Sequence, residues 1–119
     1  MTYVDGFVVP VPKKKLKAYY AIAKKFGKVA RDHGALEVRE CVADDVKKGK
    51  WTSFPRSVKL KPSETVIFSY IVYKSRADRD RVMKKIMKDK RLDDMMDPKN
   101  MPFDGKRMIF GGFKVVVKS

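Results

Sequence analysis

Histidine is the side chain best suited to general acid–base work near neutral pH, and His33 is the only histidine in the chain. A helix predicted over residues 13–33 places it at the helix C-terminus, where the helix dipole favours an imidazolium. Its projection also falls on the apolar side of that helix. His33 is therefore either a catalytic or ligand-binding group, or a residue that caps and packs the helix end.

Cys41 is the only cysteine and a candidate nucleophile. It follows His33 by eight positions, which corresponds to roughly 25 Å along an extended strand. We therefore do not expect the two to form a nucleophile–base pair within one chain, and a small buried hydrophobe is the alternative role for Cys41. A lone cysteine excludes an intramolecular disulfide and a cysteine-based metal site, which is typical of a reducing compartment.

Arg39 is the third candidate catalytic residue, because it alternates with Glu37 and Cys41 on a polar strand face. A guanidinium there would recognise a carboxylate or stabilise a developing anion. An ion pair or an exposed sheet edge explains the same pattern. Large side chains elsewhere suggest pocket walls, with core or dimer-interface packing as the alternative. The candidate ligand-pocket residues are Phe7, Arg39, Trp51, Phe54 and Tyr73.

Other motifs do not support metal or phosphate chemistry. Asp44–Asp45 lacks the spacing of a calcium loop, as do Asp93–Asp94 and Asp97, and no histidine accompanies them. Gly111–Gly112 lacks the Lys-Ser/Thr ending of a phosphate loop. We expect no metal and no cofactor.

Hydrophobic periodicity predicts the order strand, helix, strand, strand, helix, strand. The strands are predicted at residues 3–11, 35–43, 64–73 and 107–117, and the helices at 13–33 and 75–88. Residues 44–62 read as a long ordered loop with one short helix, a further helical turn is expected at 92–96, and Gly111–Gly112 indicates a bulge or a close backbone approach.

The predicted order is that of a single α+β domain over residues 1–119 with a ferredoxin-like βαββαβ fold. Two helices cover one face of a four-stranded antiparallel sheet, yet the first, third and fourth strands carry apolar residues on both faces. The uncovered face needs a partner, and a second copy of the chain is the simplest one. We therefore predict a homodimer.

The charge of the chain is strongly positive, with 29 Lys and Arg against 14 Asp and Glu and a formal net charge of +15. The polar side of the first predicted helix carries Lys17, Lys24, Lys28 and Arg31. This face is either a non-specific site for nucleic acid or another polyanion, or a solvated surface. The glycine and aromatic signature of an RNA-recognition motif is missing from residues 65–70. No apolar run is long enough for a membrane span and no signal peptide is evident, so we expect a cytoplasmic protein without a membrane partner.

Three stretches resemble a known family: Tyr3-Val4-Asp5-Gly6-Phe7-Val8, the run from His33-Gly34-Ala35 through Glu40 to Asp44-Asp45-Val46, and Met101-Pro102-Phe103-Asp104-Gly105-Lys106-Arg107-Met108 with Gly111-Gly112-Phe113. Together they resemble the YbaA-like bacterial family of unknown function, over essentially the whole chain. The resemblance implies a dimeric α/β barrel and no established activity.

Three hypotheses about the function follow. The first is a homodimeric barrel that binds, and on a stronger version transforms, a small organic molecule in a cavity beside the sheet. The second is a non-enzymatic polyanion or nucleic-acid binder that uses the basic helix face. The third is a surface-charged variant with no selected activity.

Overall fold

A four-stranded antiparallel sheet forms the centre of the molecule, with strand order β2-β3-β1-β4. The structure is a computed structural model that describes residues 2–119, apart from the side chain of Met96. The strands are β1 (Tyr3–Pro12), β2 (Glu37–Val42), β3 (Glu64–Tyr73) and β4 (Ile109–Lys114). The fold is the predicted α+β arrangement, and β3 has the predicted bounds.

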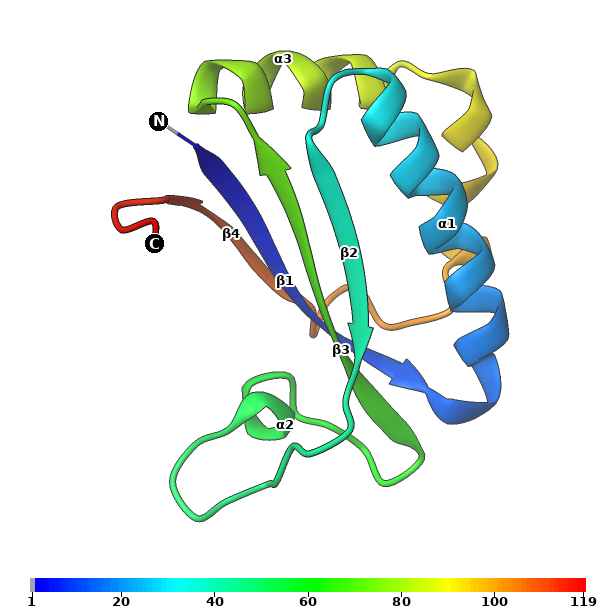
Figure 1. Cartoon of the computed structure of the whole chain (residues 1–119). Coiled ribbons are helices and arrows are strands. Elements are labelled where there is room, and N and C mark those ends of the chain that lie inside the picture. The colour runs from blue at the N-terminus through cyan, green and yellow to red at the C-terminus, as the bar shows by residue number, and fades with distance from the viewer. Residues whose placement is uncertain (1) are drawn as a thin grey trace.

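Two long helices, α1 (Leu16–Asp32) and α3 (Arg76–Met87), lie on one side of this sheet (Figure 1). The Ser75 hydroxyl accepts a hydrogen bond from the Asp78 backbone N–H at 3.1 Å and so starts α3 as expected. The first helix begins later than predicted, because Lys13–Lys15 form a 3-10 turn. Three lysines at a helix N-terminus oppose the dipole, and no side chain caps it.

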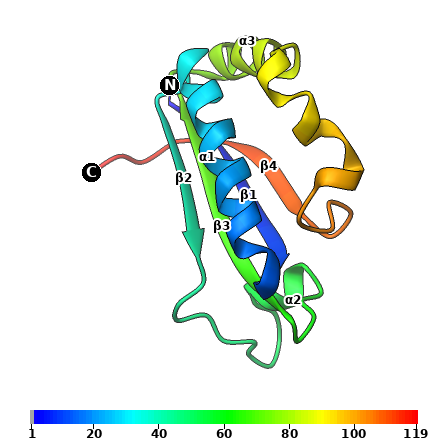
Figure 2. The same ribbon diagram turned by 90° about the vertical axis from the view of Figure 1, so that its right-hand side faces the viewer.

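Shorter helical elements lie outside this pair. They are α2 (Phe54–Ser57) within the predicted loop, and the 3-10 turns η1 (Lys13–Lys15), η2 (Lys90–Leu92), η3 (Asp94–Met96) and η4 (Pro98–Asn100). Among residues 2–119, none of the helices combines the length and apolarity that crossing a membrane requires. The segment from η2 to β4 runs beside α1 (Figure 2).

The core occupies the helix side of the sheet. Ile71 and Tyr73 pack there with Val29 and Val82. On the opposite face, Val8 and Val66 pack in a smaller cluster with the loop residue Val58, and Ala43 and Leu60 lie against it. Alternate residues of the strands therefore face two different apolar environments, as predicted.

The opposite face of the sheet remains largely open in the single chain. The side chains of Phe68, Ile109 and Phe113 are 43%, 45% and 64% exposed. Phe54 of α2 contacts Phe68 edge to face, with ring centroids 6.0 Å apart, so the loop covers only part of this face.

The last strand is shorter than its prediction, and of the two features expected at its glycines it has the close approach and not the bulge. It is shorter than residues 107–117, because Arg107 is turned toward the start of β3 and forms ion pairs there instead. No bulge interrupts it, since Val4 to Val8 pair with Phe113 to Ile109 in continuous register. Gly112 instead allows close packing, because a Cβ there would lie 2.3 Å from the Tyr3 hydroxyl oxygen.

Candidate functional site

An apolar pocket of about 200 Å³ lies between the sheet, α1 and the segment that follows η2. Its walls come from α1, from β1 to β3 and from the segment that begins at η2. They include Phe7, Phe26, Ile71, Leu92, Phe103 and Met108. Phe7 is the one predicted pocket residue among them.

Glu40 is the only charged residue that lines this pocket in the described part of the chain. Its carboxylate accepts a hydrogen bond from the Tyr19 hydroxyl at 2.6 Å and another from the Ser69 hydroxyl at 2.7 Å. Glu40 and Ser69 are direct cross-strand partners on β2 and β3, so the sheet register places them together. The sheet thus supplies one carboxylate to an otherwise apolar chamber, held from both sides.

Tyr19 is suited to the role of a permanent donor. Its side chain is buried, and burial together with the neighbouring Glu40 carboxylate raises the pKa of the Tyr19 hydroxyl far above its usual value. The hydroxyl therefore keeps its proton at all physiological pH values and continues to donate to Glu40. The hydrogen bond from Tyr19 therefore orients the Glu40 carboxylate in the same way across the physiological pH range.

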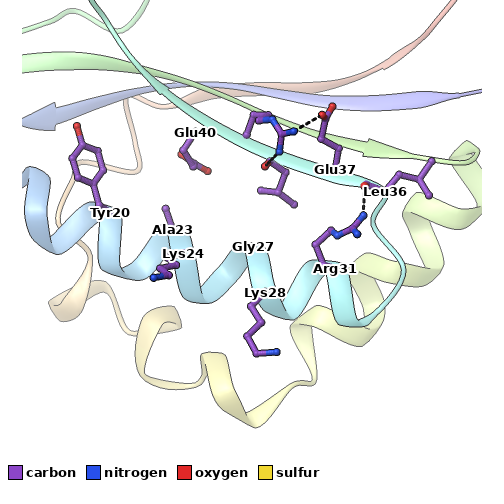
Figure 3. Close-up of a pocket in the computed structure, with 11 residues that line it drawn as sticks. Tyr20, Ala23, Lys24, Gly27, Lys28, Arg31, Leu36, Glu37 and Glu40 are labelled. Atoms are coloured by element: carbon purple, nitrogen blue, oxygen red, sulfur yellow. Dashed lines mark hydrogen bonds and ion pairs between the residues drawn. The ribbon is translucent and has the colours of Figure 1, made fainter.

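A second hollow, of about 560 Å³, is a groove between α1 and β2 (Figure 3). Lys24, Lys28 and Arg31 line it from the helix, and Arg39 lines it from the strand. Figure 3 shows Lys28 pointing away from β2, whereas the Arg31 guanidinium reaches across to the chain before β2. There Arg31 donates to the backbone carbonyl oxygens of Ala35, at 3.2 Å, and of Leu36.

The groove and the pocket share two lining residues, Ala23 and Glu40. Arg39 is largely exposed in the groove and forms an ion pair with Glu37 at 2.9 Å. The ion-pair alternative for Arg39 is thus realised. Lys17, the fourth residue of the predicted basic face, is exposed but does not line the groove.

His33 lies outside both hollows, at the C-terminal end of α1. Its Nε2 lies 2.7 Å from an Asp89 carboxylate oxygen. Hydrogen bonds from the side chain and backbone N–H of Arg91, together with the His33 contact, hold the pKa of Asp89 far below its usual range. Arg91 also pairs with Asp32 at 2.8 Å. The network fastens the end of α1 to η2.

Cys41 is exposed, near the end of β2 remote from His33. The expectation of a buried cysteine is wrong for the single chain, because β2 is an edge strand and Cys41 faces the open side of the sheet. As predicted, the fold does not bring Cys41 and His33 together. Among the described residues, no three His, Cys, Asp or Glu side chains cluster as metal ligands would.

The remaining aromatic candidates do not converge on the pocket. Tyr73 is fully buried in the core beside Ile71 but does not line the pocket. Trp51 is 92% exposed on the loop, and Phe54 packs on the open face of the sheet.

Glu40, Ser69 and Tyr19 were missed as site residues by the sequence reasoning. A signal was present, since Glu40 interrupts the apolar series Leu36, Val38 and Val42, and Ser69 interrupts the buried series of β3. A polar residue in the apolar series of each strand indicates that the two polar side chains lie side by side and face the helices. Reading that pair required the register between β2 and β3, which no local pattern supplies.

Comparisons with known proteins place the chain among proteins without an assigned activity. A family model described as "Protein of unknown function (DUF1428)" matches residues 2–105. Relatives named "Uncharacterized protein YbaA", from Escherichia coli K12 and from Shigella flexneri, are 46% identical over 117 residues, covering 98% of each chain. A solved structure, a de novo designed protein called Foldit4, aligns over 99% of this chain and 100% of its own with 11% identity and a TM-score of 0.46.

Proposed function

The chain belongs to the family of unknown function DUF1428, and we propose that it acts as a homodimer that binds a small organic molecule in the apolar pocket beside the sheet. One observation carries this proposal: a single carboxylate, oriented by two hydroxyl groups, faces a pocket whose other walls are apolar. Apolar walls with a few placed polar groups are the usual composition of a ligand site.

The homodimer is proposed from the open face of the sheet. Phe68, Ile109 and Phe113 form an exposed apolar surface across β3 and β4. A second copy packed on the same face would cover it by two-fold symmetry, and would also cover the exposed Cys41. A lone cysteine without a disulfide suits the cytoplasm, which we propose as the compartment.

Methionine methyl NMR tests the pocket directly. Met95, Met101 and Met108 line the pocket, whereas Met87 lies exposed on α3 and serves as an internal control. Titration of the ¹³C-methyl-methionine protein with benzyl alcohol should shift the three pocket signals along one saturable curve and leave the Met87 signal unmoved. Equal shifts at Met87, or none at the pocket methionines across a set of small aromatic probes, would reject the pocket as the binding site.

A second candidate function is polyanion binding, which is favoured by the four basic residues that line one groove, Lys24, Lys28, Arg31 and Arg39. Affinity for a single-stranded oligonucleotide should fall steeply between low and physiological salt. Reversal of two groove charges, Lys24→Glu with Lys28→Glu, should remove more affinity than the same change at Lys84 and Lys85.

The control residues Lys84 and Lys85 lie on α3, and their reversal makes the same change in net charge. The comparison therefore distinguishes binding in the groove from attraction by the overall positive charge. Equal losses from the two double variants would leave only the +15 charge as the cause. If neither the small aromatic probes nor the oligonucleotide bind, the third hypothesis, a surface-charged variant with no selected activity, is favoured.

A further inference from the structure

Among the described residues, Glu40 differs from the other part-buried carboxylates in having no ion-pair partner. Asp5 pairs with Arg79 at 2.8 Å, and Glu64 pairs with Arg107. Within residues 2–119, Glu40 takes part in none of the ion pairs, although the chain carries 29 Lys and Arg. A carboxylate that faces an apolar chamber without a counter-charge is costly to bury, and an incoming cation would relieve that cost.

The two hydroxyl donors do not saturate Glu40. An ionised carboxylate offers about four lone-pair positions, and Tyr19 and Ser69 occupy one on each oxygen. Because both donors are neutral, they orient the carboxylate and leave its charge uncompensated. Each oxygen can therefore accept a further hydrogen bond from a group inside the pocket.

The remaining walls restrict what that group can be attached to. No other charged side chain lines the pocket in the described residues, and its polar groups besides Glu40 are the hydroxyls that already donate to it. An anionic ligand would meet the Glu40 charge with no compensating donor. A volume of about 200 Å³ suits one ring with a short substituent, since an apolar cavity of about 150 Å³ accommodates benzene.

We propose that the ligand of this pocket is a compact apolar amine, whose ammonium group donates to Glu40 while its hydrocarbon part contacts Phe7, Phe103 and Met108. This assignment deepens the proposed small-molecule function and rests on it. The groove between α1 and β2 supplies the entry, because Glu40 and Ala23 belong to both hollows. Lys24 and Arg31 stay in the groove and do not compete for Glu40 inside the pocket.

A shape-matched probe series tests the amine assignment. Benzylammonium, benzyl alcohol, toluene and benzoate share one ring and differ in the head group. We expect benzylammonium to bind the wild-type protein at least tenfold more tightly than toluene, with benzyl alcohol between them and benzoate not bound, since a hydrogen bond to a charged group exceeds a neutral one. Methionine methyl shifts report each titration at the pocket.

Two variants connect the preference to Glu40. Glu40→Gln keeps the shape, removes the charge and should abolish the preference for benzylammonium over toluene. Glu37→Gln is the matched control on the same strand, because Glu37 pairs with Arg39 in the groove and does not line the pocket. Ser69→Ala, which removes one orienting donor, provides a second variant with a smaller expected loss if Glu40→Gln does not fold.

The outcomes separate the two proposals. Toluene binding as tightly as benzylammonium to wild type, or benzoate binding best, would overturn the amine assignment and leave the pocket as a ligand site. Failure of every probe to shift Met95, Met101 and Met108 would reject the pocket itself, and the amine assignment with it. An ammonium preference that survives in Glu40→Gln would place the recognition on another residue and overturn the assignment.

Discussion

Replacement of Arg107 by methionine is expected to destabilise the protein strongly. Arg107 donates to the two carboxylate oxygens of Glu64, from Nη1 at 2.8 Å and from Nη2 at 2.5 Å, and from Nε to Asp104 at 3.0 Å. The Glu64 side chain is only 4% exposed. The contact fastens the segment between η4 and β4, which forms one wall of the pocket, to the start of β3.

The expected cost of Arg107→Met follows from the charge that it leaves behind. Removal of one partner of a buried ion pair costs about 3–5 kcal/mol, because the other charge stays buried without compensation. Adding Glu64→Gln to Arg107→Met should recover part of that loss. Arg91→Met is the matched control, since Arg91 is 43% exposed and its loss should destabilise the protein much less than the loss of Arg107.

Urea unfolding followed by far-ultraviolet circular dichroism measures these free energies, because Trp51 is too exposed to report on the core by fluorescence. The hydrogen bonds from Arg107 hold the pKa of Glu64 below its usual 4.5. Since the folded pKa is the lower one, the stabilisation is present above pH 4.5 and is lost as pH falls through the folded pKa. A loss below about 1 kcal/mol at pH 7, or a difference that persists undiminished in acid, would refute the reasoning.

Three further changes test the packing around the site. Asp5 is buried and pairs with Arg79 at 2.8 Å, so Asp5→Asn weakens that buried contact and should lower the urea midpoint at pH 7; an unchanged or raised midpoint would count against it. Gly112→Ala places a Cβ 2.3 Å from the Tyr3 hydroxyl oxygen and should lower the free energy of unfolding by roughly 1–3 kcal/mol in the same urea assay. An unchanged urea midpoint would contradict this prediction. Phe113→Asp should convert a dimer to a folded monomer in sedimentation analysis, and an unaltered dimer would place the interface elsewhere.

Much of the fold could be predicted because its strands carry strong local patterns. Residues 64–73 carry apolar side chains at positions that face both sides of the sheet, which predicts a buried strand. The strand β3 has the predicted bounds. Ser75 caps α3 through the backbone N–H of Asp78, three residues further on, so this contact can be predicted from the local sequence. Local signals failed at the ends of elements, as at Lys13–Lys15, where three like charges weaken a helix that periodicity alone would extend.

The site was harder to foresee because it depends on contacts between distant segments. Arg107 was placed in a strand by its local pattern, whereas its partner Glu64 lies 43 positions away. Glu40 meets Tyr19 and Ser69 across 21 and 29 positions. The single histidine, His33, contacts Asp89 at the end of α1 and does not line the pocket.

Intermolecular nuclear Overhauser effects from bound benzylammonium test the central claim most directly, because they locate the ligand without a mutation. We predict cross-peaks from its ring protons to the methyl groups of Met95, Met101 and Met108, and to Ile71 at the back of the pocket. Cross-peaks to Ile109 or Phe113 on the open sheet face instead, or to none of the pocket methyl groups at saturating concentration, would contradict it.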